Sequence, residues 1–249
     1  MLSSEDFNES DPRPFPGYWW WTLALALLAA VCMPFDLHAA QMLHVENLPG
    51  DARRVILLSE FFGHGYCTVL CLLGILILVP SKSKFIPRVM FCALLPGFYI
   101  QGVKMLIGRT RPIEFHGQLP ENVAATFHGI RPGGEWNWEY ATQAFMSAHT
   151  ATAFGLALGL AWLFPRGRWL FLFLAAMTGL QRIAFEAHWL SDVVAGTAVA
   201  VMTAGAMTQN WGLGWICGRI ERRAIEHAQQ NQTDESVEQN HSTNERQAA

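Results

Sequence analysis

The stretch YWWWTLALALLAAVCMPF, residues 18–35, decides the fold, because it contains no charged side chain and has three consecutive tryptophans directly after Tyr18. A helix needs about 20 mainly apolar residues to cross the hydrocarbon core of a bilayer, whereas a strand of a membrane barrel would alternate apolar and polar residues. Tryptophan is enriched at the membrane–water interface. Residues 18–35 are therefore predicted to form a membrane-spanning helix that Trp19–Trp21 anchor at one interface.

Five further apolar runs follow, and backbone groups in lipid must be hydrogen-bonded within their own segment, which favours helices. The apolar parts of these runs lie at 65–80, 89–107, 148–164, 169–187 and 190–216. The sequence predicts an all-α integral membrane bundle of six transmembrane helices. This core covers residues 18–218, with a polar N-terminal tail at 1–17 and a polar, mostly disordered C-terminal tail at 219–249.

Composition excludes several classes of protein. Hydrophobic residues make up 51% of the chain and charged residues 15%, where a soluble domain carries about 25% charged residues. The formal net charge of −3 provides no basic surface for nucleic acid. Five cysteines, an odd number, without a CxxC pair favour neither a disulfide framework nor a zinc site. No nucleic-acid partner and no obligate protein partner are predicted.

The distribution of Lys and Arg outside the apolar runs predicts the orientation, because these residues are enriched in cytoplasmic loops. The side with the N-terminus, the loops 81–88 and 165–168 and the stretch 219–223 after the last run has nine, and the other side has seven. Three of the seven, Lys104, Arg111 and Arg182, have a catalytic explanation, and without them the balance is nine against four. We expect a multi-pass protein of the cell membrane with both termini in the cytoplasm and the loop 108–147 on the extracytoplasmic face.

Ionisable residues gather where the predicted spans meet this long loop. The three groups read KMLIGRTRP at 104–112, MSAH at 146–149 and RIAFEAHWLSD at 182–192. A charge at the bilayer centre costs about 2.5–3.5 kcal/mol on insertion scales, so ionisable residues at the ends of spans are candidates for function.

Two histidines and one aspartate among these residues suit phosphoryl transfer. His188 and Asp192 are four apart and would share a helix face, where a carboxylate that accepts the Nδ1 proton leaves Nε2 free to attack phosphorus. His149 can protonate the leaving alkoxide and then activate water. Alternatively, His188 and Asp192 form an ordinary polar pair, or bind a metal with His149. Because no third close-spaced ligand follows, no metal is predicted.

The remaining candidates are cations and a helix start. Lys104, Arg111 and Arg182 supply the positive charge that a phosphate dianion needs, and guanidinium groups match pairs of phosphate oxygens. Ser147 lies where the fourth run begins, so its hydroxyl and the amides that follow form an anion site.

Other charges near these motifs have simpler explanations. An ordinary helix salt bridge is expected between Arg182 and Glu186, which are also four apart. Arg109 and Arg131 are expected to be solvated loop charges, with a contact to a lipid headgroup as the alternative.

Taken in order, the three groups resemble the phosphatase signature of the type 2 phosphatidic acid phosphatase family. That signature is Lys, six residues, Arg-Pro; then Pro-Ser-Gly-His; then Ser-Arg, five residues, His, three residues, Asp. The resemblance covers residues 18–218, and three positions depart from it: Met146 for Pro, Ala148 for Gly and Gln181 for Ser. A Cβ at Ala148 would crowd the phosphate if the backbone must approach it closely.

The resemblance implies a role for each matching residue. His188 would be the nucleophile, Asp192 its partner and His149 the acid and base. The phosphate would be bound by Lys104, Arg111, Ser147, Ala148 and Arg182, without a metal or cofactor.

The predicted function is hydrolysis of a lipid phosphate through a phosphohistidine. The substrate is either a phosphatidic-acid-like phosphomonoester or an isoprenyl pyrophosphate. Two alternatives stay open: a lipid phosphotransferase of the same family, and a membrane transporter with buried charges. A transporter would place its charges near the bilayer midplane, whereas here they cluster at one end of the spans.

Overall fold

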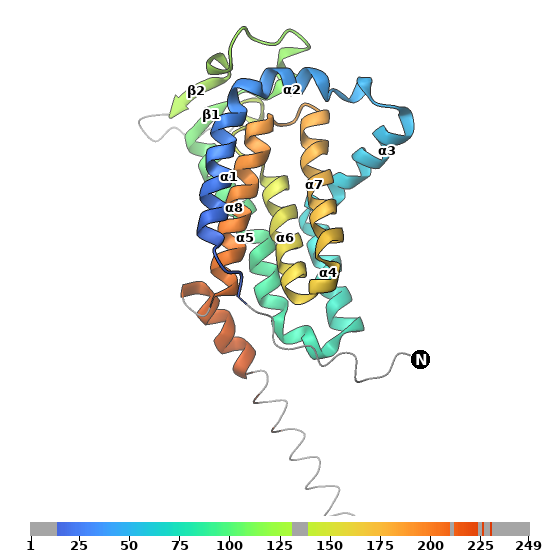
Figure 1. Ribbon diagram of the computed structural model, residues 1–249, viewed down its shortest axis with the longest axis vertical. Helices are drawn as coiled ribbons and strands as arrows, with labels where there is room; N and C mark the ends of the chain where they lie inside the picture. The colour runs from blue at the N-terminus through green and yellow to red at the C-terminus, as the bar shows by residue number, and fades with distance from the viewer. Residues whose placement is uncertain (1–13, 131–138, 210–211, 224–225, 227–229, 231–249) are drawn as a thin grey trace, which may run out of the picture.

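The computed structural model describes residues 14–130, 139–209, 212–223, 226 and 230. Most of both predicted tails, and Arg131, lie outside the described residues. Each of the six apolar runs forms a helix, and these helices pack side by side (Figure 1). They are α1 (Tyr18–Cys32), α4 (Gly65–Leu78), α5 (Ile86–Leu106), α6 (Ala148–Leu163), α7 (Arg168–Ala184) and α8 (Leu190–Thr208).

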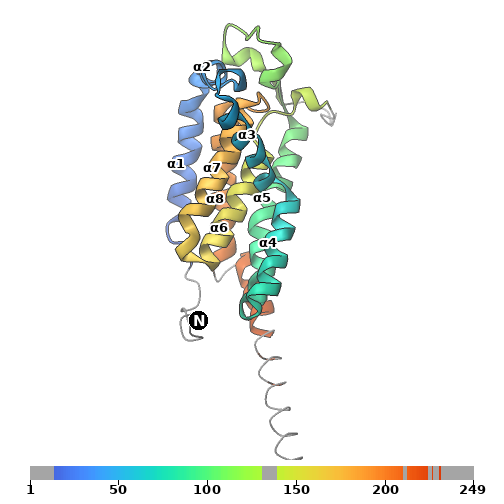
Figure 2. The ribbon, with the colours of Figure 1, turned by 90° about the vertical axis from the view of Figure 1, so that its right-hand side faces the viewer.

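Among the residues that the structure describes, three helical segments are long and apolar enough to cross a membrane: Tyr18–Met42, Pro80–Leu106 and Leu190–Thr208. A fourth span arises if α3 (Gly50–Ser59) and α4 count as one, although the chain bends by 70° between them. In Figure 2, α3 runs obliquely while α4 follows the bundle axis. The chain is thus a mostly helical membrane protein with three or four candidate spans, and six spans stay a prediction because α6 has only 16 residues.

α6 lies at the centre of the bundle and packs against α5, α7 and α8. Small residues allow the close approach, as is usual between helices in membranes. A Cβ at Gly155 would overlap the carbonyl of Cys92 on α5, and a Cβ at Gly159 would lie 3.2 Å from a side-chain atom of Val89. α1 covers the outside of α8, where Tyr18 fills the space above Gly205.

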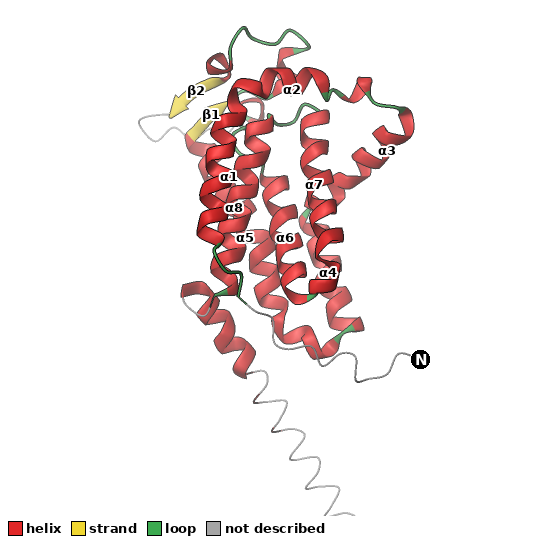
Figure 3. Cartoon of the chain, in the orientation of Figure 1, coloured by secondary structure: helices red, strands yellow, loops and turns green. Residues whose placement is uncertain are grey.

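One end of the bundle carries a cap that the all-α prediction did not contain. β1 (Ile107–Arg109) continues α5 and pairs antiparallel with β2 (Phe127–Ile130). α2 (Asp36–Met42) crosses this same end (Figures 1 and 3). Short 3₁₀ turns complete the connections: Met33–Phe35, Val45–Asn47, Glu60–Gly63, Pro80–Phe85, Pro112–Phe115, Val123–Thr126, Tyr140–Thr142 and Pro165–Gly167.

Arg88 forms a buried ion pair at the opposite end of the bundle. Its guanidinium meets both carboxylate oxygens of Glu221, at 2.6 and 2.8 Å, and donates to the carbonyl of Met207 at 2.5 Å. Arg88 is therefore not a loop charge, and neither is Arg109, described below. Removing both from the predicted count leaves eight Lys and Arg on the side of the termini against three. Trp19–Trp21 at that end are exposed, as an interfacial anchor requires.

Candidate active site

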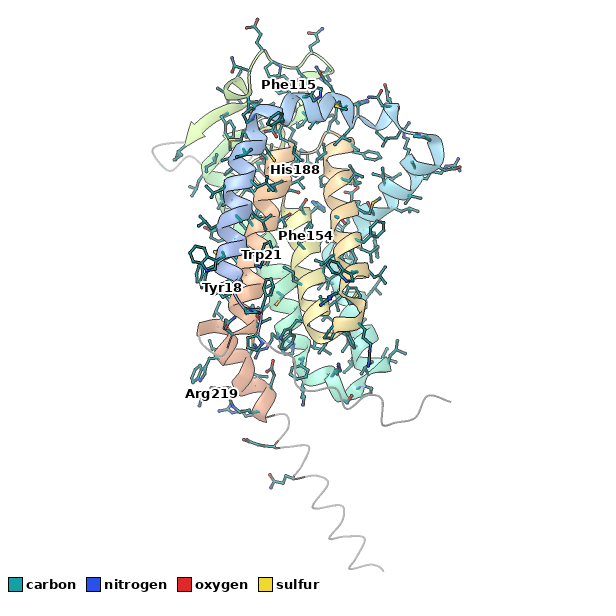
Figure 4. The ribbon with its side chains drawn as sticks, viewed as in Figure 1. Tyr18, Trp21, Phe115, Phe154, His188 and Arg219 are labelled. Atoms are coloured by element: carbon teal, nitrogen blue, oxygen red, sulfur yellow. The ribbon has the colours of Figure 1, made fainter. Side chains whose placement is uncertain are left out.

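The three sequence groups converge at the capped end of the bundle. Lys104 lies in the last turn of α5, Ser147 immediately precedes α6, and Arg182 lies in the last turn of α7. His188 occupies the short loop between α7 and α8, at the capped end in Figure 4, whereas Arg219 marks the opposite end. Asp192 lies in the first turn of α8. The charges are thus at one end of the helices, which argues against a transport path through the midplane.

His188 is held in one tautomer by the backbone. Its Nδ1 lies 2.8 Å from the carbonyl oxygen of Ala144, and its side chain is 1% exposed. A carbonyl only accepts hydrogen bonds, so Nδ1 carries the proton and Nε2 keeps its lone pair. Burial lowers the pKa of His188 well below its usual range, and the charges of Lys104, Arg111 and Arg182 lower it further. The imidazole is therefore neutral at pH 7, as a nucleophile must be.

The expected hydrogen bond from His188 to Asp192 does not form. The nearest carboxylate oxygen, Oδ2 of Asp192, is 3.9 Å from Nδ1 of His188. The carbonyl oxygen of Ala144 accepts the hydrogen bond from Nδ1 instead. Oδ2 accepts the backbone N–H of Trp189 at 3.1 Å and thereby caps the start of α8. Asp192 is close enough to stabilise a positive imidazole but does not fix the tautomer.

Arg109 is not a solvated loop charge. It is fully buried, and its guanidinium joins two carboxylates, Oδ1 of Asp192 at 2.5 Å and Oδ2 of Asp36 at 2.5 Å. The guanidinium also lies over the rings of Phe127 and Trp189, whose centroids are 4.4 and 5.4 Å away. The prediction failed because the deciding carboxylate comes from the first apolar segment of the chain.

Arg182 pairs with Glu60 rather than with Glu186. Nη2 of Arg182 lies 2.6 Å from Oε1 of Glu60, and Nε donates to the side chain of Gln181 at 2.5 Å. Gln181 in turn donates to Oε2 of Glu60 at 3.0 Å, so the residue that replaces the family's serine holds the pair together. Glu186 has left the helix with φ 54° and lies 3.6 Å from His44, and the expected salt bridge is therefore wrong.

Arg111 holds the surrounding loops. Its guanidinium donates to the carbonyls of Tyr140 (3.0 Å), Ala187 (3.1 Å) and Gln143 (3.3 Å), and it stacks on the ring of Tyr140 at 3.8 Å. Three of the five donors of a guanidinium are used in this way. Among the described contacts, two donors are left for a phosphate oxygen.

Ser147 caps α6 with its side chain. Its Oγ accepts the backbone N–H of Thr150 at 3.3 Å and the hydroxyl of Thr150 at 2.8 Å. The amides of Ala148 and His149 occupy the first helical positions, where no carbonyl of the same helix can accept them. These amides, more than the hydroxyl, make the helix start suitable for an anion.

His149 contacts a residue that the sequence did not single out for chemistry. The rings of His149 and His64 meet edge to face with centroids 4.7 Å apart. A Cβ at Gly63 would lie 2.8 Å from the carbonyl of His149, so only glycine lets this turn approach α6 so closely. His64 lies 3.6 Å from Glu60, which links His149 to the partner of Arg182.

Glu60, His64 and His149 also form a possible cation site, since their ligand atoms lie within 4.8 Å of one another. The surroundings disfavour a cation there. Arg182 already holds the carboxylate of Glu60 at 2.6 Å, and a metal would add a further positive charge to that pair.

Sequence reasoning missed four members of this region: Asp36, Glu60, His64 and the carbonyl of Ala144. Asp36 could have been singled out from the sequence, because it directly follows 18 residues without a charge. A carboxylate within a membrane segment almost always pairs with another polar group. Glu60 had no such signal beyond its position between two apolar runs.

These features define a mostly helical membrane protein in which two histidines and three buried cations gather at one end of the bundle. The model of the PAP2 superfamily matches residues 85–214, just over half of the chain. The chain belongs to the PAP2 superfamily, in agreement with the resemblance seen in the sequence.

Two curated relatives carry the name lipid A 1-phosphatase. The protein from Rhizobium johnstonii is 32% identical over 108 residues, which is 43% of this chain and 40% of that protein. The protein from Rhizobium etli is 33% identical over 96 residues, which is 39% of this chain and 37% of that protein. The matches thus span about two fifths of the length of these relatives.

A solved structure has the same fold. The crystal structure of Aquifex aeolicus LpxE aligns with a TM-score of 0.52 and 19% identity, and the alignment covers 71% of this chain and 96% of that chain. At this identity the likeness concerns the fold alone.

Proposed function

We propose that this protein is a membrane lipid phosphate phosphatase that works through a phosphohistidine at His188. The observation that carries the proposal is the buried, neutral imidazole of His188, whose Nδ1 proton is held by Ala144 and whose lone pair on Nε2 is available near three cations. Membership of the PAP2 superfamily and the names of the curated relatives support a phosphatase.

The reaction proceeds in two balanced steps. Nε2 of His188 attacks phosphorus, the P–O bond to the lipid breaks, and His149 gives its proton to the leaving alkoxide. His149 then takes a proton from water, the hydroxide attacks phosphorus, and the N–P electron pair returns to Nε2 as orthophosphate leaves. Asp192 stabilises the positive imidazole between the steps, from 3.9 Å.

The positive charge for this reaction comes from side chains. Lys104 and Arg111 are each 4% exposed and Arg182 is 6% exposed, so water screens them weakly from a bound phosphate. Preorganised charges of this kind stabilise the extra negative charge of the transition state. The proposed reaction therefore uses neither a metal nor a cofactor.

Two of the described cavities lie beside the site, and their linings do not include its two histidines or its three cations. A cavity of about 480 Å³ lies beside the loop that carries His188 and has polar lining from His44, Glu46 and Glu186. A second cavity of about 300 Å³ lies between α1 and α8, reaches Met146, and has an almost wholly apolar lining. We assign the polar headgroup to the first and an acyl or isoprenyl chain to the second.

The curated relatives suggest the phosphate of a lipid A-type headgroup as one substrate. Phosphatidic acid and an isoprenyl pyrophosphate are the other candidates, because the same cations bind any of these phosphates. The charge count supports a site on the extracytoplasmic face and both termini in the cytoplasm.

The test is phosphate release by purified protein in mixed micelles, with these three lipid phosphates offered in parallel. His188→Ala should abolish release, and His128→Ala, at an exposed histidine of the cap, is the matched control and should keep it. Phosphate that appears on an added alcohol instead of in solution would establish the phosphotransferase alternative. EDTA should leave the rate unchanged, and abolition by EDTA with rescue by Zn²⁺ would refute the phosphohistidine and turn the histidines into metal ligands.

A further inference from the structure

A chain of three buried charges runs from the first apolar segment to the candidate active site. Asp36 at the start of α2, Arg109 on β1 and Asp192 on α8 are each 0% exposed. Arg109 lies 2.5 Å from a carboxylate oxygen on either side. Asp36 also accepts the backbone N–H of Ser191 at 2.8 Å and the hydroxyl of Ser191 at 2.6 Å, which ties it to the residue before Asp192.

Every oxygen of the two carboxylates has a donor within these contacts. Asp36 takes Ser191 N–H on Oδ1 and Arg109 on Oδ2, and Asp192 takes Arg109 on Oδ1 and Trp189 N–H on Oδ2. Such complete pairing lets buried charges persist, because an unpaired one would cost several kcal/mol. The carboxylate of Asp192 is thus fixed in one orientation, with Oδ2 facing Nδ1 of His188.

The sum of the charges is as important as the geometry. Two carboxylates and one guanidinium give the cluster a net charge of −1, although Arg109 alone would neutralise Asp192. Asp36 therefore restores the negative charge that faces His188. When Nε2 bonds to phosphorus the imidazole becomes positive, and a net negative cluster stabilises that state in a buried setting.

We propose that Asp36 is a positioning residue of the active site, which acts through Arg109 to orient Asp192 and to keep its negative charge available to His188. Asp36 lies outside residues 85–214, the region that the PAP2 model matches. The inference rests on the proposed function, in which His188 is the nucleophile. It adds α2 to the machinery that otherwise comes from the matched region.

The test compares Asp36→Asn with Glu221→Gln. Both changes turn the carboxylate partner of a buried arginine into an amide, but Glu221 meets Arg88 at the opposite end of the bundle. Asp36→Asn should lower kcat about 10- to 100-fold at an unchanged KM, the usual effect of losing an outer partner of a site. Glu221→Gln should keep kcat within about threefold while it loses a similar amount of thermal stability.

Two further measurements separate positioning from folding. Trapping the phosphoenzyme in a single turnover should show a slower first step in Asp36→Asn, and Asp36→Glu should recover part of kcat because it restores the charge. If Asp36→Asn does not fold, Arg109→Lys tests the same connection. A single ammonium cannot bind both carboxylates as the guanidinium does. This variant should lower kcat at an unchanged KM.

The outcomes distinguish the inference from the function on which it rests. A folded Asp36→Asn or Arg109→Lys with wild-type kcat overturns the inference, as does a loss of kcat in Glu221→Gln equal to that in Asp36→Asn. Full activity in His188→Ala overturns the proposed function itself, whatever the Asp36 variants do.

Discussion

Gly196→Ala should inactivate the protein through a displacement of less than 1 Å. Gly196 lies on α8, one turn after Asp192, where the helix passes the start of α6. A Cβ at Gly196 would lie 2.6 Å from the carbonyl oxygen of Ser147, whereas an ordinary contact begins at 3.4 Å. The two helices must therefore separate by roughly 0.8 Å, because neither atom belongs to a flexible side chain.

The displacement acts directly on the site. The carbonyl of Ser147 accepts the N–H of Ala151 at 3.0 Å. The backbone N–H of Ser147 donates to the carbonyl of Asp192 at 3.1 Å. His149 thus moves relative to His188, and a misplacement of about 1 Å costs about 100-fold in rate. We expect kcat/KM to fall by about that factor, equivalent to about 2.7 kcal/mol in the activation free energy.

The assay is phosphate release in micelles, together with thermal unfolding in the same detergent. Gly74→Ala is the neutral control, since no atom lies within 4 Å of the added Cβ. Gly155→Ala is the matched control, because its Cβ would overlap the carbonyl of Cys92 away from the motifs and should lower stability while the folded fraction keeps its activity. The reasoning fails if Gly196→Ala retains kcat/KM within threefold, or if Gly155→Ala loses as much.

Three further predictions concern Arg182, pH and orientation. Glu60→Gln should lower kcat/KM about 10- to 100-fold by releasing Arg182, whereas Glu121→Gln, at an exposed carboxylate of the cap, should not; equal rates for the two variants would remove Glu60 from the site. The folded-state pKa of His188 lies below its unfolded value of about 6.5, so its contribution to stability is present above pH 6.5 and is lost as the pH falls below that value. The melting temperature of the wild type should therefore drop more between pH 7.5 and pH 5 than that of His188→Asn, and parallel drops would contradict this. Glu121→Cys in a chain without its native cysteines should react with an impermeant thiol reagent in intact cells, because the loop 108–147 is expected to face outward. Labelling only after lysis would show that this loop faces the cytoplasm.

The spacing of the motifs was enough to predict which end of the molecule carries the site. Lys104, Ser147 and Arg182 each stand at the end of an apolar run, and ends of neighbouring antiparallel helices meet at one side of a bundle. The family was predicted from the same spacing. Periodicity and length could not reveal the bend between α3 and α4 or the hairpin of β1 and β2, because both depend on packing between distant segments.

Partners of the charged residues were predicted less well. The local rule that residues four apart pair on a helix suggested Glu186 for Arg182 and Asp192 for the proton of His188, but the chain leaves the helix at Phe185. The observed partner of Arg182 is 122 positions away and that of Arg109 is 73 positions away. Arg109 and Arg111 have the same side chain two residues apart, and only the tertiary structure decides that one is an internal bridge and the other supports the loops.

The position of α1 and α2 has a practical consequence for dividing or recombining this chain. A fragment limited to residues 85–214 would contain every motif of the signature but would leave Arg109 with a single carboxylate, Gly205 without the ring of Tyr18 above it, and Arg182 without Glu60. Chimeras between relatives should therefore exchange the segment from Tyr18 to Gly63 together with the catalytic half. A junction near residue 85 would join two halves whose buried charges no longer match.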